Sequence, residues 1–399
     1  MRLGEPAAPG LIVHVFVAAA GPEAAAGERR LRQVWDALGD RLHMPASTVG
    51  TVEVRTARGL PLRQAVLRQE HDMRCLSVAL TGGSWKELDA LWAGCAGADI
   101  GEWALGECRL FVAYGRTRRA DRIVAALPQP YMPRTKPESY TTSRMTTRDG
   151  LALWEVGHEQ DTRSRRVFAV IASRRLETRL DAWAWTAGDD RMAPFARYLM
   201  HAAKVRYHLR VYADGASVRA ARRRVDEQVD ATMALLGDDG LTSARRELTE
   251  RQTAAAGLIW AATRLREMRR SVEIALHNMR AQALEDDLAL TEWFLRRLDD
   301  DLAYAEAARE RAREIAAIAD IVLAERLQLR AEKTERRWER FGVLSAAVIG
   351  SLVMMLTAVQ SLNYRVPIPD SVKPFIVAAL ALTAFGVTAF GVVRWRRSR

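Results

Sequence analysis

Cysteine and histidine are the residue types best suited to nucleophilic catalysis, and His71 and Cys75 stand four residues apart in the segment RQEHDMRC. Such a pair works only when the two side chains meet and further groups orient the His and stabilise an oxyanion. A strand that begins near Met73 would keep the two side chains from facing each other, and the sequence identifies no orienting or oxyanion residue. We therefore expect no catalytic residue, and the sequence predicts a protein that is not an enzyme.

Other combinations of residues that bind metals or cofactors are equally absent from the sequence. It carries no Gly-rich phosphate loop, G-x-S-x-G elbow, HExxH or paired Cys motif. Cys75, Cys95 and Cys108 are dispersed, which gives no disulfide framework and fits a reducing compartment. His201 and His208 share a helix face at a spacing too long for one ion, so we expect them to pack. We expect no metal and no cofactor.

Two acidic clusters, at 285–287 and 299–301, are the one arrangement of carboxylates that suggests a divalent cation. Adjacent residues on a helix point in different directions, so neither cluster converges on an ion without a partner helix. We interpret both clusters as solvated helix surface, and a divalent-cation site is the alternative.

Two uncharged apolar stretches, 341–364 and 374–393, follow near the end of the sequence. As helices they would measure about 36 and 30 Å, against a hydrocarbon core of about 30 Å. The apolar run at 11–20 lacks the flanking basic cluster of a signal peptide. We therefore predict a transmembrane hairpin with the outer loop 365–373, and membrane lipid as a partner.

Basic residues flank this hairpin unevenly. The residues just before the first stretch and just after the second include Lys333, Arg336, Arg337, Arg340, Arg394, Arg396, Arg397 and Arg399. The loop between the stretches holds only Arg365 and Lys373. Basic residues concentrate on the cytoplasmic side of membranes. The distribution predicts that both ends of the chain are cytoplasmic, with 394–399 as a basic tail.

Polar residues gather toward the outer end of the first stretch, among them Gln360, Ser361 and Asn363. They are candidates for a narrow pore mouth. Residues this close to a helix end also reach the headgroups and water without any pore, and we favour that interpretation. Neither stretch contains an Asp, Glu, Lys, Arg or His residue, which argues against a pump or transporter driven by intramembrane charge.

Long helices dominate 216–340, which we interpret as a stalk. Apolar residues recur there at intervals of three and four, interrupted by the turn Gly237-Asp238-Asp239-Gly240 and by Gly257, which a helix can tolerate. This predicts a helical hairpin followed by a long helix that begins near Glu285 and continues without Pro or Gly into the first apolar stretch. From about 286 to 363 that helix would be about 115 Å long.

The remaining part, 1–215, alternates strands and helices and predicts an α+β head, an α/β sandwich of one sheet with flanking helices. We expect it to comprise 1–127, a Pro/Ser/Thr-rich loop at 128–147, and 148–215. The predicted strands are 11–17, 75–81, 108–114, 151–156 and 166–171; the predicted helices are 24–38, 63–70, 85–96, 119–127, 174–186 and 192–212.

The chain is basic, with 60 Lys and Arg against 49 Asp and Glu and a net charge of +11. A basic surplus attracts nucleic acid, the anionic inner leaflet or an acidic protein. Since no nucleic-acid-binding motif accompanies the charge, we do not expect nucleic acid as a partner.

The order of head, helical hairpin, long helix, two spans and basic tail over 217–399 resembles the CorA family of divalent-cation channels, which are pentamers. CorA proteins end their first span in Gly-Met-Asn and an aromatic residue, and this chain has Ser361-Leu362-Asn363-Tyr364. Asn363 and the aromatic residue agree with that pattern. The Gly and Met are replaced, and the loop holds Arg365 and Lys373 rather than acidic residues, which speaks against magnesium selectivity.

The head resembles the CATRA proteins in its strand LIVHVFV and in the segments at 62–92 (LRQAVLRQEHDMRCLSVALTGGSWKELDALW) and 104–115 (ALGECRLFVAYG). CATRA proteins are predicted components of actinobacterial conflict systems, encoded with caspase-like proteases and TPR proteins. The resemblance implies a non-enzymatic partner of such proteins.

Together these observations predict a sensor or adaptor anchored in the bacterial inner membrane. Its cytoplasmic head would recognise a partner, with a caspase-like protease or a TPR protein as candidates, and the stalk would couple it to a homo-oligomeric membrane hairpin. The alternative is a CorA-like divalent-cation channel or effector pore, and only this alternative requires a divalent cation.

Overall fold

The computed structural model describes residues 7–362, except 22, 98–99, 116–119, 129–130, 132–139, 148–149, 159–161, 186–190 and 283, together with short pieces of 369–390. The chain divides into two units. The first unit is Met1–Asp226 with Glu250–Glu310, and the second unit is Glu227–Thr249 with Arg311–Arg399.

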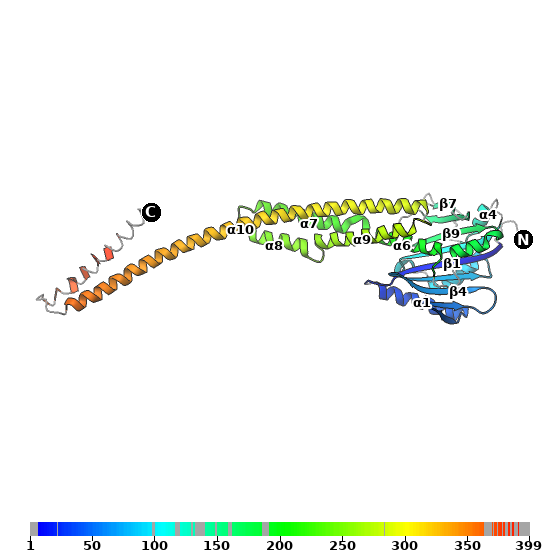
Figure 1. Cartoon of the computed structure of the whole chain (residues 1–399), viewed down its shortest axis with the longest axis horizontal. Helices are drawn as coiled ribbons and strands as arrows, with labels where there is room; N and C mark the ends of the chain where they lie inside the picture. The colour runs from blue at the N-terminus through cyan, green and yellow to red at the C-terminus, as the bar shows by residue number, and fades with distance from the viewer. Residues whose placement is uncertain are drawn as a thin grey trace. The chain divides into compact units, whose positions relative to one another are not determined.

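Within the described residues, nine strands of the first unit form one sheet in the order β2-β3-β4-β5-β1-β6-β9-β8-β7 (Figure 1). The strands are β1 (Ala7–Ala18), β2 (Ala46–Val49), β3 (Val52–Thr56), β4 (Arg63–Glu70), β5 (Met73–Thr81), β6 (Gly106–Tyr114), β7 (Tyr140–Thr146), β8 (Ala152–His158) and β9 (Arg165–Ala172). β6 and β9 are parallel, and the other neighbouring strands are antiparallel. The mixed sheet with its helices confirms the predicted α+β class.

The helices lie between and after these strands. They are α1 (Ala24–Leu42), α2 (Trp85–Ala96), α3 (Ile100–Trp103), α4 (Ala120–Val124), η2 (Arg174–Leu176), α5 (Glu177–Ala184), α6 (Pro194–Tyr212), η3 (Ala213–Gly215), α7 (Ala216–Ala234), α8 (Leu241–Thr253), α9 (Leu258–Met279) and α10 (Glu285–Leu362). Local sequence explains several starts. Ser84 and Glu87 form a capping box at α2, and Pro194 opens α6, where its missing N–H costs nothing.

The two faces of the sheet are covered by different helices, because successive residues of a strand point to opposite faces. Val13 and Val15 of β1 share a buried core with Leu31 and Leu38 of α1. On the other face, Phe168 of β9 packs edge-on against the ring of Phe195 of α6. The first unit is therefore a sheet between two helical layers (Figure 1).

The layer formed by α6 supports the candidate site. The rings of Phe168 and Phe195 of α6 have centroids 5.5 Å apart, and Sγ of Cys75 on β5 lies 3.6 Å from Sδ of Met200 on α6. All four side chains are buried. This packing fixes α6 across the sheet, so that polar side chains of β8 and β9 lie opposite it.

Three expectations about local structure are wrong. Residues 63–70, expected as a helix, form β4 and pair along their length with β5. Arg, Gln, Ala, Leu and Glu favour helices on their own, but pairing with a neighbouring strand overrides that weak preference. Part of the expected loop 128–147 is β7, and β2 and β3 lie where no strand was expected.

Gly257 also differs from expectation, because it separates two helices instead of lying within one. α8 ends at Thr253 and α9 begins at Leu258, with Gly257 extended as its N-cap. A Cβ atom at Gly257 would lie 2.6 Å from the carbonyl oxygen of Gln252 and 2.8 Å from that of Ala254. The turn between the helices therefore requires glycine.

In the second unit, α10 packs with α8 and with the turn after α7. Arg245 of α8 forms a salt bridge with Asp320 of α10, with two N–O distances of 3.0 Å. Arg326 of α10 donates to the carbonyl oxygens of Leu236 and Asp238, at 2.9 and 2.6 Å. Both carbonyl oxygens belong to the turn after α7, and the guanidinium group satisfies them there.

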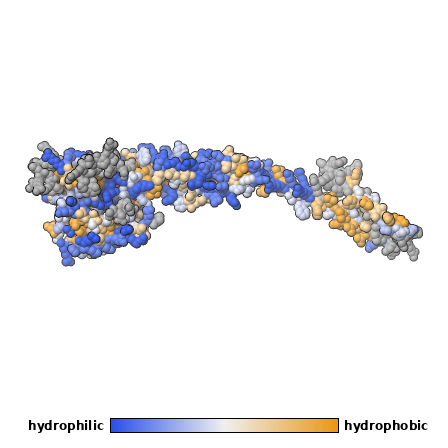
Figure 2. All heavy atoms as spheres, turned by 180° about the vertical axis from the view of Figure 1, so that it is seen from behind, coloured by the Kyte–Doolittle hydropathy of each residue, from blue (hydrophilic) through white to orange (hydrophobic). Residues whose placement is uncertain are grey.

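The last part of α10 is apolar and exposed, and the largely orange surface toward the right of Figure 2 includes it. Among the described residues, one helix, α10, is long enough and apolar enough to cross a membrane. α10 runs without a break from Glu285 to Leu362, as expected for the long helix. Most of the second predicted span, 374–393, lies outside the described residues.

Candidate functional site

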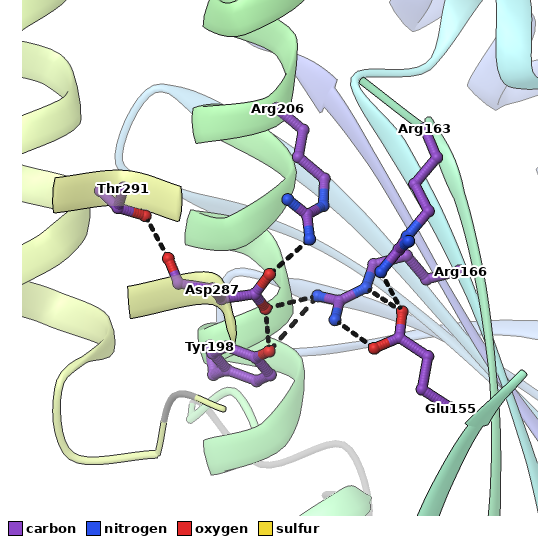
Figure 3. A network of polar contacts seen from close by, with 7 residues as sticks. All are labelled: Glu155, Arg163, Arg166, Tyr198, Arg206, Asp287 and Thr291. Carbon is purple, nitrogen blue, oxygen red and sulfur yellow. Dashed lines mark hydrogen bonds and ion pairs between the residues drawn. The ribbon is translucent and has the colours of Figure 1, made fainter. Parts of the chain in front are cut away.

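Arg166 lies at the centre of a buried network of charged side chains in the first unit (Figure 3). It belongs to β9, and its Nε and Nη2 atoms donate to the carboxylate oxygens of Glu155 on β8 at 2.8 and 2.7 Å. Its Nη1 atom donates to Oδ2 of Asp287 on α10 at 2.7 Å. One guanidinium group therefore links a carboxylate of the sheet to a carboxylate of the long helix.

Asp287 is held from α6 as well. Nη2 of Arg206 donates to Oδ1 of Asp287 at 2.5 Å, and the hydroxyl of Tyr198 donates to Oδ2. One turn further along α10, Oγ1 of Thr291 donates to the carbonyl oxygen of Asp287 at 2.6 Å. The first turn of α10 is thus fastened to both β9 and α6 by charge-assisted hydrogen bonds, which are the stronger kind.

Both carboxylates of the network are ionised at neutral pH. Burial by itself would raise the pKa of Asp287, but Arg166, Arg206 and the hydrogen bond from Tyr198 outweigh it and lower that pKa to about 2. Burial opposes ionisation of Glu155 too, and Arg166 and Arg163 still lower its pKa. The network is therefore a cluster of full charges inside the protein.

The positive charges outnumber the negative ones in this network. Nη2 of Arg163 donates to Glu155 at 2.8 Å, so Arg163, Arg166 and Arg206 share two carboxylates. Burial, together with the nearby Arg166 and Arg163, lowers the pKa of Arg206 although Asp287 opposes this. The buried Nε of Arg206 has no hydrogen-bond partner among the described residues. Loss of either carboxylate would therefore increase this excess of buried positive charge.

The network is suited to holding elements together rather than to proton transfer. General acid/base catalysis needs groups whose pKa lies near the working pH. Here the pKa values of Asp287 and Glu155 are lowered, and those of Tyr198 and Arg166 are raised well above their ordinary values, with burial as the largest cause for Tyr198. We call these seven residues the buried clamp, defined as Glu155, Arg163, Arg166, Tyr198, Arg206, Asp287 and Thr291 (Figure 3).

A second contact joins α6 to α10 further along both helices. The hydroxyl of Tyr212 donates to Oδ2 of Asp301 at 2.6 Å, and the ring of Tyr212 packs edge-on against Phe294 with centroids 5.4 Å apart. Asp301 and Asp287 are about 21 Å apart along a straight helix. The helix is therefore fixed at two points within the first unit.

The interpretation of both acidic clusters as solvated surface is wrong for two residues. Asp287 and Asp301 have exposed fractions of 2% and 6%. The sequence carries a signal for this, because both residues fall in the same helical stripe as Phe294 and Leu298, which are buried. An acidic residue in phase with an apolar stripe indicates a buried partner.

The residues considered for cysteine chemistry are placed differently. β5 begins at Met73, as expected; Cys75 is buried, and His71 is exposed at the preceding turn. Burial raises the pKa values of Cys75, Cys95 and Cys108, which keeps these thiols protonated. Among the residues that the structure describes, no three His, Cys, Asp or Glu side chains are grouped to hold a metal ion.

Of the two histidines expected to pack, His201 is buried and His208 is partly buried, and His14 is buried as well. His14 is buried in β1 with Nδ1 2.9 Å from Oγ of Ser77, and burial lowers its pKa to about 3. Burial also lowers the pKa values of His201 and His208 on α6 to about 4. These three imidazoles are neutral at pH 7.

The predicted membrane residues are described only in part. Gln360 and Ser361 lie in the last turns of α10, with Gln360 exposed. Asn363 and the tail arginines Arg394, Arg396, Arg397 and Arg399 lie outside the described residues. Arg336 and Arg337 are exposed on α10, Arg336 lies 3.7 Å from Glu332, and Arg340 is also in the helix. Their orienting role remains a prediction.

Comparison with known proteins divides the buried clamp between two domains. Residues 10–188 match the family model of the CASPASE and TPR Repeat-Associated N-terminal domain, and residues 193–312 match that of the corresponding C-terminal domain. Glu155, Arg163 and Arg166 belong to the first match, and the other clamp residues belong to the second. The clamp therefore lies where the two domains meet.

The similarity to one solved transporter structure is weak, and the curated proteins give no match. The structure of the CorA magnesium transporter from Methanocaldococcus jannaschii aligns with a TM-score of 0.25 and 12% identity, over 71% of this chain and 89% of the transporter chain. A similarity this weak supports no statement about fold or transport. No curated protein matches the sequence.

Proposed function

Because the chain belongs to the CASPASE and TPR Repeat-Associated (CATRA) family, we propose that it is a non-enzymatic sensor or adaptor of a bacterial conflict (defence) system, anchored in the inner membrane. The observation that carries the proposal is the buried clamp, which ties the sheet to α10 through Asp287. The same helix contains the apolar stretch. A partner that binds the head can therefore act on the membrane end through one continuous helix.

The composition of α10 supports the membrane anchor. Phe341, Leu344, Ile349 and Leu352 each expose more than half of their surface. Exposed apolar surface on this scale is costly in water and favourable in lipid. With the apolar sequence at 374–393, this stretch would form a hairpin whose flanking arginines keep both ends of the chain cytoplasmic.

The chemistry of the clamp supports an adaptor over an enzyme. Its charged groups are paired with one another inside the protein, and its carboxylates stay ionised at neutral pH. The family name associates these domains with caspases and TPR repeats. We propose such proteins as partners, with homo-oligomers of the chain at the membrane.

Flotation on a density gradient tests the anchor. We expect the full chain to float with liposomes of bacterial inner-membrane lipids, and a chain truncated before residue 341 to stay in the soluble fraction. A full chain that stays at the bottom of the gradient would refute the anchor. A truncated head that hydrolysed peptides or nucleotides would refute the non-enzymatic role.

A further inference from the structure

A cavity of about 470 Å³ opens at the edge of the sheet, away from the buried clamp. Its walls include apolar side chains of the segments on either side of β2 and β3, and two arginines, Arg58 and Arg63. Cavities of this volume are typical of small-ligand or side-chain pockets. No acidic residue is among those that line it. The lining of the cavity therefore combines apolar side chains with a surplus of positive charge.

The two arginines are available for a ligand. Among the residues that the structure describes, no carboxylate lies within ion-pair distance of Arg58 or Arg63. The Nε atom of Arg63 is buried and has no hydrogen-bond partner in the described part of the chain. A guanidinium group presents a planar set of donors that matches a carboxylate. A carboxylate in the cavity would be attracted to these two guanidinium groups.

The apolar wall is prominent and held in place. Leu60 is 94% exposed at the rim. Its neighbour Pro61 packs against Gly82, which has φ +86, and a Cβ atom at Gly82 would lie 2.1 Å from Cβ of Pro61. The amide of Ala57 donates to the carbonyl oxygen of Arg63 at 2.9 Å and closes the loop. The backbone that carries Leu60 is therefore held in place, and its exposed side chain offers an apolar contact at the rim.

The cavity adjoins β2, whose outer edge has no paired strand among the described residues. β2 is the first strand of the sheet, pairs with β3 and exposes all four of its side chains. Pro45, which lines the cavity, immediately precedes β2 and accepts a hydrogen bond from Thr56 at 3.3 Å. An unpaired edge is a template for an added strand. A peptide that pairs with β2 would place a side chain in the cavity at the Pro45 end.

We propose that the edge of β2 and this cavity bind an extended acidic segment of a protein partner, which adds a strand to the sheet and inserts a carboxylate between Arg58 and Arg63. The positive, acid-free lining selects an acidic segment, and the edge selects an extended one. This inference rests on the proposed adaptor role, because it states where and by what chemistry the head recognises its partner.

Fluorescence anisotropy of labelled peptides with the full chain in detergent micelles tests the proposal. The probes are a peptide that alternates Val with Glu, the same peptide with Lys in place of Glu, and the Val–Glu peptide with every second amide N-methylated. We expect only the first to bind. Arg58→Gln and Arg63→Gln should each weaken its binding about tenfold, and Arg175→Gln, which changes an exposed arginine elsewhere on the head, should not.

Hydrogen exchange provides a readout that is independent of the variants. Binding of the Val–Glu peptide should slow exchange of amides in β2. The proposal is overturned if this peptide does not bind, if the arginine variants bind it equally well, or if the N-methylated peptide binds as tightly. Each of these results leaves the flotation test of the membrane anchor unaffected, so the two proposals fail separately.

Discussion

Arg166 of β9 and Asp287 of α10 form a buried ion pair, with Nη1 and Oδ2 2.7 Å apart and exposed side-chain fractions of 6% and 2%. The two residues are far apart in the sequence and belong to different CATRA domains. A buried ion pair adds little stability compared with an apolar contact, yet breaking one is costly. Its effect is therefore to permit one position of α10 against the sheet and to penalise others.

The clamp predicts a strong response to removal of one charge. Asp287→Asn leaves Arg163, Arg166 and Arg206 opposite Glu155 alone, so we expect the free energy of unfolding to fall by about 3–5 kcal/mol. Urea unfolding of the full chain in micelles, followed by near-ultraviolet circular dichroism, measures this.

Glu306→Gln is the matched control for this prediction. Glu306 pairs with Arg266 at 2.6 Å, and both side chains are at least 44% exposed. An exposed pair contributes about 0–1 kcal/mol. Equal destabilisation by the two variants would show that the buried clamp has no special role in fastening α10.

The sequence predicts those elements in which the apolar residues recur at a spacing typical of a helix or form a continuous run typical of a buried strand. Examples are the strand around Val13 and the helix around Leu31. Sequence patterns were misleading for β4, where residues with helical preference pair with a neighbouring strand. The clamp was not predicted, because its charges are balanced by partners such as Arg166 and Asp287, which only the folded chain brings together. The buried position of Asp287 could have been inferred from its phase with Phe294.

Buried His14 predicts that the protein loses stability in mild acid. Its pKa is lowered from 6.5 to about 3 by burial and by the nearby Arg68. Between these values the unfolded chain binds a proton that the folded chain does not. Stability therefore falls as the pH falls from 6.5 toward 3, by about 1.4 kcal/mol per pH unit from this residue.

Replacement of His14 by Gln should remove that part of the pH dependence. Free energies of unfolding measured from about pH 7 to pH 5 should decline less steeply in His14→Gln than in the parent chain. His201 and His208 act in the same direction and leave a residual slope. An unchanged slope in His14→Gln would contradict the prediction.

The contact between Tyr212 and Asp301 predicts a smaller effect at the second attachment of α10. Tyr212→Phe keeps the ring packed on Phe294 but removes the hydroxyl donor of a buried carboxylate. We expect a loss of about 1–3 kcal/mol in the free energy of unfolding. Tyr304→Phe, at a tyrosine of α10 that is 60% exposed, should cost far less. Similar values for the two variants would rule out a structural role for the hydrogen bond.

The proposed span predicts different effects of the same substitution at two exposed leucines of α10. Leu352 lies inside 341–364 and is 54% exposed, whereas Leu327 lies before it and is 65% exposed. An arginine at the centre of a span costs about 3 kcal/mol on insertion scales. In a microsomal glycosylation assay of residues 320–364 in a reporter protein, Leu352→Arg should sharply reduce the inserted fraction, and Leu327→Arg should leave it unchanged. Failure of the parent segment to insert would contradict the span at 341–364, and the anchor would then have to be sought in residues 374–393. Equal insertion of the Leu327→Arg and Leu352→Arg segments would contradict the placement of Leu352 at the centre of the span.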